Sequence, residues 1–590
     1  MDAEGKTFKF LTDNAYYEIP FFQRAYVWNE DNWEDLIENL MSEKPSFLGS
    51  IIVKHIGEVK MGKPVKFSVV DGQQRLTTIS ILLKAISVVF PKDRQQPLGM
   101  NIDGYLWLVT SIDGTKITKI SHSKYDKTFY EAVMKDEVDI DKVNDDSHPI
   151  LRCYKYFLSV LNNLLEQSLQ KVYDIFLKLT TEQCIVGITL SQDDNEQTIF
   201  DTINNAGVKL TSADTIKNSI FQRALELCRD ENERKRVIKK YESSWETKFS
   251  ESEEQVAFWD AEKRSGRVMR TNLEIFLHSF AIIKNIFNPQ NNKIEDLAQC
   301  YKDYISDKNI EEMYQLIDEI DAYANSYNIT WCDYNPSKID FSNIQNRLLL
   351  IFDKYDVSTY TPYMLYCVKN FDYAESNRRL AVLEKYLIRN IICGRSTKNY
   401  NKECYSVIHG EFDLEVALKL DALSDGALRA GIHHMNNKQA TLVLFLIELH
   451  RRNNPKCDEK SLSWGYSLEH VMPQDFGSNW SVGTLPVYGI DNTQILDAKV
   501  AEEYRLECIY SLGNMTLLTK QLNASIKNSS FNKKINGNGR YPGVKDLSTL
   551  FITRNDIIDP FLAGDTIWDE RKIRNREENL YQEILEIWPL

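Results

Sequence analysis

The sequence predicts a predominantly helical α+β protein with more than one domain. The chain has 590 residues, more than the roughly 250–300 residues that one hydrophobic core organises. Strand and helix patterns alternate near the N-terminus, and apolar residues at helical spacing dominate the middle of the chain. We therefore expect a mixed α/β domain near residues 1–225, a helical domain near residues 226–440 and a third domain near residues 441–590.

The composition is typical of a soluble globular protein. Hydrophobic residues make up 43% of the chain and charged residues 26%, and no apolar run approaches the roughly 20 residues of a membrane helix. The first residues are acidic and polar, unlike a secretory signal. The ten cysteines include no CxxC pair, which favours reduced thiols. We expect a cytoplasmic protein without a membrane partner.

The overall charge gives no sign of a nucleic-acid partner, but one segment does. The net charge is −14, which excludes a generally basic surface. One stretch nevertheless carries basic residues and no acidic one: Lys520, Lys527, Lys533, Lys534, Arg540 and Lys545. Such a run is ordinarily a solvated surface, and it indicates phosphate binding only when catalytic residues lie beside it.

The N-terminal region predicts two strands followed by a buried helix. SFLGSIIVKHI is rich in β-branched residues, and KFSVVDG reads as a second strand that an Asp-Gly turn ends. LTTISILLKAISVVF then has apolar residues on all sides at helical spacing. The polar residues of DGQQR should therefore lie at a helix N-terminus, where free N–H groups and the helix dipole favour an anion.

A set of side chains around this turn is suited to phosphate binding. Guanidinium groups pair bidentately with phosphate oxygens, glycine permits close approach of the backbone, and a carboxylate can hold a cation or orient a water. The candidates are Arg24, Asp71, Gly72, Gln73, Gln74, Arg75 and Thr77. The alternative is a purely structural turn and helix cap with salt bridges.

The aromatic segment IPFFQRAYVW has two possible uses. Its rings are expected to lie partly in the core, together with Trp33 of the next helix. The alternative is a pocket for an unusual DNA group, such as a phosphorothioate or a glucosylated base, formed by Pro20, Gln23, Tyr26 and Trp28.

A second set of polar residues follows near the C-terminus. SLEHVMPQ places Glu469 and His470 side by side at a strand end, LGN ends a later segment at Asn514, and Asn523 follows. Phosphodiester hydrolysis needs a base for water and a cation for the developing charge. His470 is a candidate base, and Glu469 and Asn523 offer oxygen ligands that suit Mg²⁺ or Mn²⁺. Asn514 would hold the histidine or its loop.

These motifs resemble a known family. EHVMP, GNMTLL, Asn523 and FNKK resemble the ββα-metal (HNH) nuclease motif, and more closely the C-terminal domain of GmrSD-type restriction enzymes. No histidine follows His470, so the resemblance implies that Asn523 takes the place of the motif's second histidine, as in HNN variants. Lys533 and Lys534 would then bind DNA phosphates.

The N-terminal motifs resemble the other domain of the same systems. IPFFQRAYVW, FLGSI, VVDGQQRLTTI and the later IFDTINNAGVKLTSAD resemble the distantly ParB-like GmrSD N-terminal domain. Both halves in one chain resemble the single-chain members, including the SspE and BrxU types. The resemblance implies that the cluster around DGQQR binds and hydrolyses a nucleoside triphosphate, GTP or ATP.

The function expected from these features is that of a modification-dependent, type IV-like DNA endonuclease or nickase of anti-phage defence. Its partner would be double-stranded DNA, modified by phosphorothioate or on a base, and the protein could be a homodimer. Two alternatives stay open: a DNA-modification sensor with a degenerate nuclease domain, and a nucleotide hydrolase within a larger defence complex. His433 and His434 are expected to be structural, and the acidic segment IEEMYQLIDEIDAY is expected to be a solvated helix.

Overall fold

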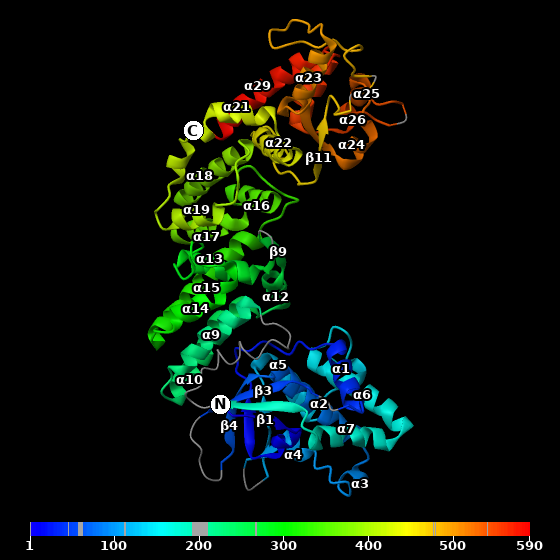
Figure 1. Ribbon diagram of the computed structural model, residues 1–590, viewed down its shortest axis with the longest axis vertical. Coiled ribbons are helices and arrows are strands. Elements are labelled where there is room, and N and C mark those ends of the chain that lie inside the picture. The colour runs from blue at the N-terminus through cyan, green and yellow to red at the C-terminus, as the bar shows by residue number, and fades with distance from the viewer. Residues whose placement is uncertain are drawn as a thin grey trace. The chain divides into compact units, whose positions relative to one another are not determined.

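A computed structural model describes residues 2–44, 47–56, 63–110, 114–190, 211–265, 268–475, 477, 479–539 and 541–590. The chain forms two compact units, residues 1–241 and 242–590 (Figure 1). Most described residues are helical, and the first unit contains a mixed sheet, so the predicted α+β class with predominant helix is confirmed. The segment IFDTINNAGVKL, which sequence analysis singled out, lies outside the described residues.

The first unit is organised around a six-stranded mixed sheet with strand order β1-β8-β3-β4-β2-β7. β3 and β4 are antiparallel, with Val53 opposite Val69, whereas β2 runs parallel to β4. Both strands predicted from the β-branched runs are confirmed. The bounds are β1 (Asp2–Lys6), β2 (Ala15–Glu18), β3 (Ser50–Ile56), β4 (Val65–Asp71), β7 (Ile120–Ser121) and β8 (Ile185–Leu190).

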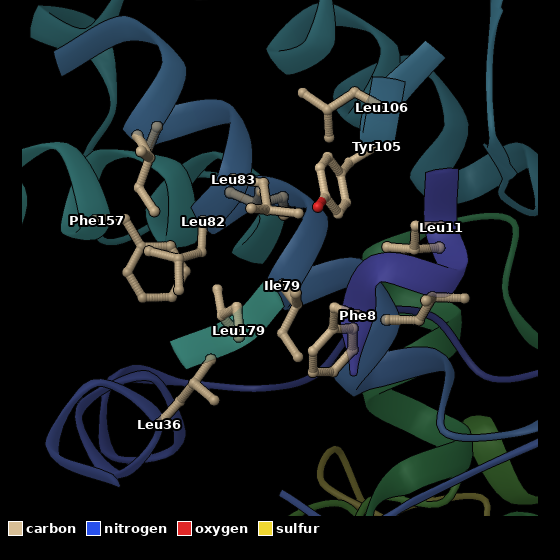
Figure 2. Packing of buried hydrophobic residues seen from close by; sticks show 14 of the residues in the cluster. Phe8, Leu11, Leu36, Ile79, Leu82, Leu83, Tyr105, Leu106, Phe157 and Leu179 are labelled. Atoms are coloured by element: carbon tan, nitrogen blue, oxygen red, sulfur yellow. The ribbon is translucent and has the colours of Figure 1, made fainter. Parts of the chain in front are cut away.

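The helix predicted after the Asp-Gly turn is the central helix of this unit. α2 (Gln73–Val89) is buried along nearly its whole length, as its apolar residues on all sides predicted. Figure 2 shows Ile79 and Leu82 of this helix among side chains from other elements, including Phe157 and Leu179. Because α2 packs against the sheet and helices together, its first turn is held rigidly at the carboxyl end of β4.

Further helices complete the unit. They are η1 (Phe8–Thr12), α1 (Glu30–Met41), α5 (Lys124–Met134), α6 (Pro149–Gln167), α7 (Leu169–Thr181), α9 (Ser212–Glu226) and α10 (Glu231–Lys240). Of these, α5, α6 and α7 pack against α2. Thr211 caps α9 by accepting a hydrogen bond from the Asp214 backbone N–H. A short hairpin of β5 (Trp107–Val109) and β6 (Lys116–Thr118) lies apart from the main sheet.

The second unit begins with a helical body, as predicted. Its principal helices are α12 (Glu253–Asp260), α13 (Asn272–Ile283), α14 (Leu297–Ile305), α15 (Ile310–Cys332), α16 (Ile344–Tyr355), α17 (Thr361–Asn370), α18 (Tyr373–Ile392), α19 (Tyr400–Ile408), α21 (Asp425–His433) and α22 (Asn437–Arg452). The acidic segment forms α15, where Asn309 and Glu312 make a capping box. A small hairpin, β9 (Glu262–Ser265) with β10 (Val268–Thr271), was not predicted.

The C-terminal part of the second unit is built around two antiparallel strands. β11 (Tyr466–His470) pairs with β12 (Met515–Thr519), and α24 (Lys520–Ile526) follows β12 directly. The remaining helices are α23 (Ala498–Ile509), α25 (Phe531–Asn536), α26 (Val544–Leu547), α27 (Phe551–Thr553), α28 (Asp559–Leu562) and α29 (Glu570–Ile587). A core that includes Met472, Ile509 and Trp568 holds these elements together.

Two general expectations about the chain can be compared with the structure. Among the described residues, no helix combines the length and apolar character needed to cross a membrane. The ten cysteines are free thiols, in agreement with the expectation from their spacing.

Candidate functional sites

The C-terminal site is assembled where β11 ends. Glu469 and His470 are the last residues of that strand, and His470 lies opposite Met515 of β12. The side-chain nitrogen of Asn523, on α24, donates hydrogen bonds to the Leu468 carbonyl at 2.8 Å and to the Ser467 hydroxyl at 3.0 Å. Strand pairing and the following helix therefore bring Asn523 beside the strand end that carries Glu469 and His470.

Lys534 forms a buried ion pair with Glu469. Its ammonium lies 2.5 Å from Glu469 Oε1 and 3.0 Å from the His470 carbonyl, and the residue is only 2% exposed. This differs from the expectation that Lys534 binds DNA phosphate, because a buried, paired ammonium cannot reach a phosphate without breaking the pair. Lys533, the preceding residue, is exposed, as a residue that contacts DNA phosphate must be.

The environment of His470 keeps its imidazole neutral. The residue is 9% exposed, and burial together with the nearby Lys534 lowers the pKa of His470 to about 4. Gln474 Nε2 lies 3.5 Å from His470 Nε2, and the ring of Tyr510 lies beside the imidazole at a centroid distance of 6.2 Å. A neutral imidazole at pH 7 can accept a proton from water.

Asn514 is fully buried and holds the loop that follows His470. Its side-chain oxygen accepts hydrogen bonds from the Met472 backbone N–H at 2.8 Å and from Trp568 Nε1 at 3.1 Å. Its side-chain nitrogen donates to the carbonyls of Met472 at 2.8 Å and Ile509 at 3.1 Å. Of the two roles considered for Asn514, the geometry corresponds to holding the loop.

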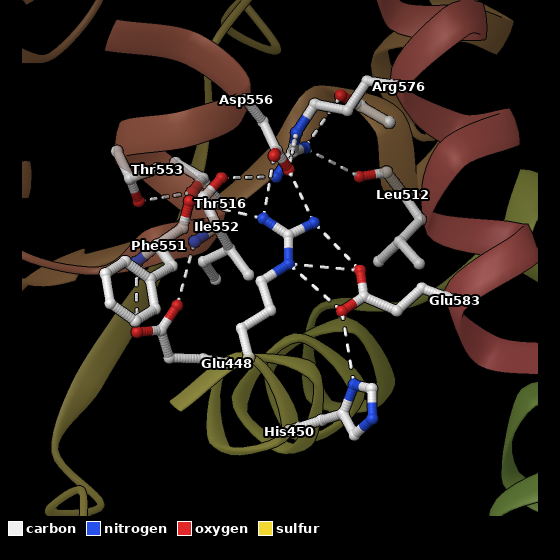
Figure 3. A network of polar contacts seen from close by, with 12 residues as sticks. Glu448, His450, Leu512, Thr516, Phe551, Ile552, Thr553, Asp556, Arg576 and Glu583 are labelled. Carbon is white, nitrogen blue, oxygen red and sulfur yellow. Dashed lines mark hydrogen bonds and ion pairs between the residues drawn. The ribbon is translucent and has the colours of Figure 1, made fainter. Parts of the chain in front are cut away.

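Arg576, which was not among the predicted site residues, supports the turn that contains Asn514. Its guanidinium donates to the carbonyls of Gly513 at 2.9 Å and Met515 at 2.6 Å, and pairs with Asp556 at 3.1 Å (Figure 3). Arg576 lies on α29, more than 50 residues along the chain from this turn. No local sequence signal could have indicated this contact.

The same network ties the site to helix α22 of the helical body. Figure 3 shows Glu448 of this helix beside Phe551 and Ile552, and His450 beside Glu583. Arg451 pairs with Asp556 at 2.8 Å and with Glu583 at 2.9 Å. Glu448 accepts hydrogen bonds from the backbone N–H groups of Phe551 at 3.0 Å and Ile552 at 2.9 Å. The strand β12 and α27 are thereby anchored to α22.

The donor groups at the strand end fit a hard divalent cation. Asn523 uses its side-chain nitrogen for its hydrogen bonds to Ser467 and Leu468, and Glu469 Oε1 is paired with Lys534. The Asn523 side-chain oxygen and Glu469 Oε2 are therefore the candidate ligand atoms. Among the described residues, no group of three or more His, Cys, Asp or Glu side chains is arranged as a metal site. Two protein oxygens completed by waters suit Mg²⁺ or Mn²⁺ better than Zn²⁺, which is typically held by three or four protein ligands.

The N-terminal site surrounds the first turn of α2. Gly72 adopts the left-handed conformation with φ of +88°, and an added Cβ would lie 2.9 Å from the Ser50 carbonyl oxygen. Asp71, Gln73 and Arg75 are half-buried around this turn. Arg75 donates to the Ser50 carbonyl at 2.7 Å and lies 4.0 Å from Asp71. The predicted polar cluster therefore does lie at a helix N-terminus.

Arg24 joins the cluster from a distant part of the chain, and so does Asp214. Burial lowers the pKa of Arg24, and the charges of Asp214 and Asp71 oppose that shift. Asp214, in the first turn of α9, pairs with Lys217 at 3.2 Å. Asp214 was not among the predicted site residues, because only the fold brings α9 beside Arg24.

Two of the predicted nucleotide contacts have internal partners instead. Gln74 donates to the Ala25 carbonyl and accepts from the Val27 N–H, and it is 7% exposed. Thr77 lies 2.8 Å from His122 Nε2 and is 2% exposed. Gln74 thus fixes the segment around residue 25 to α2, and Thr77 joins α2 to His122, which follows β7. Both contacts differ from the expected direct contact with a nucleotide.

The aromatic segment serves mainly as core. Tyr26 is 2% exposed, and its hydroxyl bonds to the Thr78 hydroxyl at 2.6 Å and accepts from Trp33 Nε1 at 2.9 Å. The Gln23 amide donates to the Val69 carbonyl at 2.6 Å. Pro20 is buried, and Trp28 is half-buried against the core. The prediction that the segment lies partly in the core is confirmed, and Tyr26 and Gln23 are engaged within the domain where a modification pocket was considered.

The structure also describes most of the basic run and the environment of His433. Of the basic run, Lys520, Lys527 and Lys533 are exposed, and Arg540 lies outside the described residues. His433 Nδ1 lies 3.2 Å from Glu577 of α29, which raises the pKa of His433. This contact agrees with a structural role for that histidine.

Comparison with known proteins places both sites in one family. Residues 7–221 match the family described as GmrSD restriction endonuclease, N-terminal domain, and residues 420–583 match GmrSD restriction endonucleases, C-terminal domain. The two matches together cover more than half of the chain, and each contains one of the two sites. The protein is thus of the class in which both restriction-endonuclease domains lie on one polypeptide. The chain belongs to the GmrSD restriction endonuclease family.

One curated relative is also similar to this chain. It is an uncharacterized protein of Methanocaldococcus jannaschii, 25% identical over 229 residues. The match covers 34% of this chain and 38% of the relative's length.

Proposed function

We propose that this protein is a modification-dependent, type IV-like DNA endonuclease or nickase, in which a nucleotide-binding N-terminal domain controls a metal-dependent HNH-type nuclease. The observation that carries the proposal is the assembly of Glu469, His470 and Asn523 at the end of β11. The antiparallel pair β11 and β12 followed directly by α24 supports a ββα-metal domain. The family membership supports DNA as the substrate.

A bound Mg²⁺ or Mn²⁺ would neutralise charge that develops on the phosphate and on the leaving oxygen. Glu469 and Asn523 would hold this cation. His470 would take the proton of the attacking water at its imidazole, which burial keeps neutral. Asn514 and Arg576 hold the loops that position this base. Lys533 would bind a DNA phosphate from the exposed face of α25.

The N-terminal cluster would bind a nucleoside triphosphate, GTP or ATP. The free N–H groups of the first α2 turn favour an anion, and Arg24 and Arg75 supply guanidinium groups beside it. Asp71 and Asp214 provide carboxylates in the same cluster. The N-terminal domain would then be a distantly ParB-like domain that senses a DNA modification and controls DNA cleavage. Such control would suit a cytoplasmic role in anti-phage defence.

The test is cleavage of supercoiled plasmid, unmodified or carrying phosphorothioate or glucosylated bases, with Mg²⁺ or Mn²⁺ and with or without nucleotide. We expect nicked or linear product that disappears in His470→Ala, and dependence on nucleotide that disappears in Arg75→Ala. Nucleotide hydrolysis by a protein that never cuts DNA under these conditions would instead favour a sensor with a degenerate nuclease domain. Equal cutting by His470→Ala would overturn the catalytic assignment.

A further inference from the structure

The chain segment that carries Arg24 has no regular element to fix its backbone. Residues 24–29, between β2 and α1, adopt neither helix nor strand, and Arg24 itself is half-buried. Backbone groups that are shielded from water need hydrogen-bonding partners from elsewhere when no helix or strand supplies them. Here the partners are side chains of α2 and α5, which lie 49 and 100 residues further along the chain.

Two glutamines of α2 bind the backbone of this segment. Gln74 donates to the Ala25 carbonyl at 3.1 Å and accepts from the Val27 N–H at 2.9 Å. Gln73 donates to the Arg24 carbonyl at 3.2 Å. The segment is therefore fastened to the first turn of α2 by side chains that come from the polar cluster itself.

A buried carboxylate of α5 binds the same segment. Asp126, which is 5% exposed, accepts a hydrogen bond from the Tyr26 N–H at 2.9 Å. Its other oxygen lies 3.3 Å from His148 Nε2, and His148 Nδ1 accepts from the Ile150 N–H. A carboxylate is costly to bury unless such partners compensate it. Asp126 was not among the predicted site residues, and its contacts tie α5 to the segment that carries Arg24.

The Arg24 side chain, in contrast to its backbone, is not fully paired. Its Nε is buried without a hydrogen-bond partner among the described residues, and the charges of Asp214 and Asp71 act on the guanidinium. An unpaired buried donor is destabilising, and a phosphate oxygen would satisfy it. A fixed backbone that carries an unsatisfied guanidinium is suited to bind an anion without reorganisation.

We propose that Asp126 and Gln74 are positioning residues for Arg24 in the nucleotide site. They would fix the backbone that follows Arg24, so that its guanidinium stands ready before a nucleotide binds and binding need not order the segment. Neither residue would contact the nucleotide. This inference rests on the proposed nucleotide binding and goes beyond it, because it assigns α5 a part in that site.

The test measures nucleotide affinity in the full chain with and without Arg24. Calorimetric titration with GTP and with ATP, each with Mg²⁺, is made for Asp126→Ala and Gln74→Leu, alone and combined with Arg24→Ala. If Arg24→Ala binds no measurable nucleotide, Arg24→Lys takes its place in the comparison. Tyr130→Phe is the matched control, because Tyr130 joins the same two helices through a buried hydrogen bond to Ser80 at 2.9 Å rather than through the Arg24 segment.

We expect Asp126→Ala and Gln74→Leu each to weaken nucleotide binding by roughly 2- to 150-fold, which corresponds to the coupling typical of residues in one hydrogen-bond network. Without Arg24 the same two changes should have little further effect, because the residue that they position is gone. Tyr130→Phe should leave the affinity unchanged. Asp126→Asn should bind nucleotide more tightly than Asp126→Ala, since it keeps an oxygen that can accept from the Tyr26 N–H.

Amide hydrogen exchange gives a second readout that needs no nucleotide. The Tyr26 N–H should be protected in the wild-type chain and lose protection in Asp126→Ala, and the Val27 N–H should lose protection in Gln74→Leu. The same measurement shows whether each variant is folded, because the amides of the buried helix α2 are protected only in a folded domain.

Three results would overturn the positioning role: wild-type affinity in both single variants, equal losses of affinity with and without Arg24, or a loss in Tyr130→Phe as large as that in Asp126→Ala. If Asp126→Ala does not fold, Gln74→Leu, which conserves side-chain volume, decides the same comparison. Absence of nucleotide binding to the wild-type chain would overturn the proposed nucleotide site and the positioning role with it. Binding by the wild type with equal losses in both backgrounds would overturn the positioning role alone, so the two failures are distinguishable.

Discussion

Two neighbouring lysines on α25 have opposite environments. Lys533 is exposed, whereas Lys534 is 2% exposed and pairs with Glu469. A single turn of helix thus provides one ammonium for solvent or DNA and another that fixes a carboxylate of the candidate metal site. Residue type gives no indication of this difference, because it depends on which face of the helix packs against β11.

Replacing each lysine by methionine should separate these roles. Lys534→Met leaves the buried Glu469 without its partner, which typically costs about 3–5 kcal/mol in the free energy of unfolding. Lys533→Met should change stability by less than about 0.5 kcal/mol but should weaken DNA binding and reduce its salt dependence. Denaturant unfolding and DNA titration at several salt concentrations measure both effects. Equal stability of the two variants would contradict the buried pair.

His122 should make the first unit sensitive to acid. Burial, and secondarily the nearby His148, lower the pKa of His122 to about 3, against 6.5 in an unfolded chain. Between these values the unfolded state binds a proton that the folded state does not. The stabilising contribution is therefore complete above about pH 6.5 and is lost as the pH falls toward 3.

His122→Gln should reduce the slope of the free energy of unfolding against pH by up to about 1.4 kcal/mol per pH unit. Denaturant unfolding of the two proteins at a series of pH values gives the comparison. His55→Gln, which changes a half-buried histidine on β3, is the control. If the slope below pH 6.5 were the same in wild type and His122→Gln, the buried neutral state of this histidine would be wrong.

At the scale of elements, the start of α2 depends on one glycine. Gly72 has φ of +88° and lies close to the Ser50 carbonyl, whereas Gly99 has φ of +71° with no atom within 4 Å of an added Cβ. The two positions share the left-handed backbone strain that a side chain would introduce. They differ in the close approach between strand β3 and the first turn of the helix.

Gly99→Ala should therefore cost about 1–2 kcal/mol of stability from the left-handed conformation alone. Gly72→Ala should cost a further 1–3 kcal/mol or so, because the Cβ would press on a backbone atom that cannot rotate away. Nucleotide binding should weaken only in Gly72→Ala. Thermal unfolding and nucleotide titration measure these effects, and identical costs at the two glycines would show that the close approach is relieved easily.

At the scale of the second unit, α22 belongs both to the helical body and to the C-terminal part that is built around β11 and β12. It packs against α16 and α18 on one side and against β11, β12 and α29 on the other. Arg451, 17% exposed, joins Asp556 and Glu583 at this junction. The described contacts therefore give the C-terminal site a rigid attachment to the helical body.

Arg451→Met should destabilise the second unit by up to about 3–5 kcal/mol, because two carboxylates with little exposure would lose a shared guanidinium. Asp556 would keep only Arg576 as a partner, and Glu583 would keep only His450. DNA cleavage should fall as well, although Arg451 does not contact the reacting groups. Arg429→Met is the control, since Arg429 pairs with Glu578 on the surface, where such pairs contribute about 0–1 kcal/mol. Unchanged cleavage and stability in Arg451→Met would show that the junction does not support the site.

The sequence predicted several features that the structure confirms. The strands that became β3 and β4, the buried helix α2 and the helical middle all followed from periodicity and β-branched residues. The proximity of Glu469, His470 and Asn523 followed from ordered motifs within the C-terminal domain. Other assignments needed the fold: Lys534 as the partner of Glu469, Arg576 as the support of the Asn514 turn, and Tyr26 as a core residue.

The sequence by itself determined local structure, family and the chemistry of the reactive groups, because these depend on residue types at short and fixed spacings. The tertiary structure decided which charges are buried and paired and which predicted ligands have internal partners. Asp214 reaches Arg24, and Arg451 reaches Glu583, only after the chain has folded. Contacts between residues more than 100 positions apart depend on packing, which no short segment of the sequence encodes.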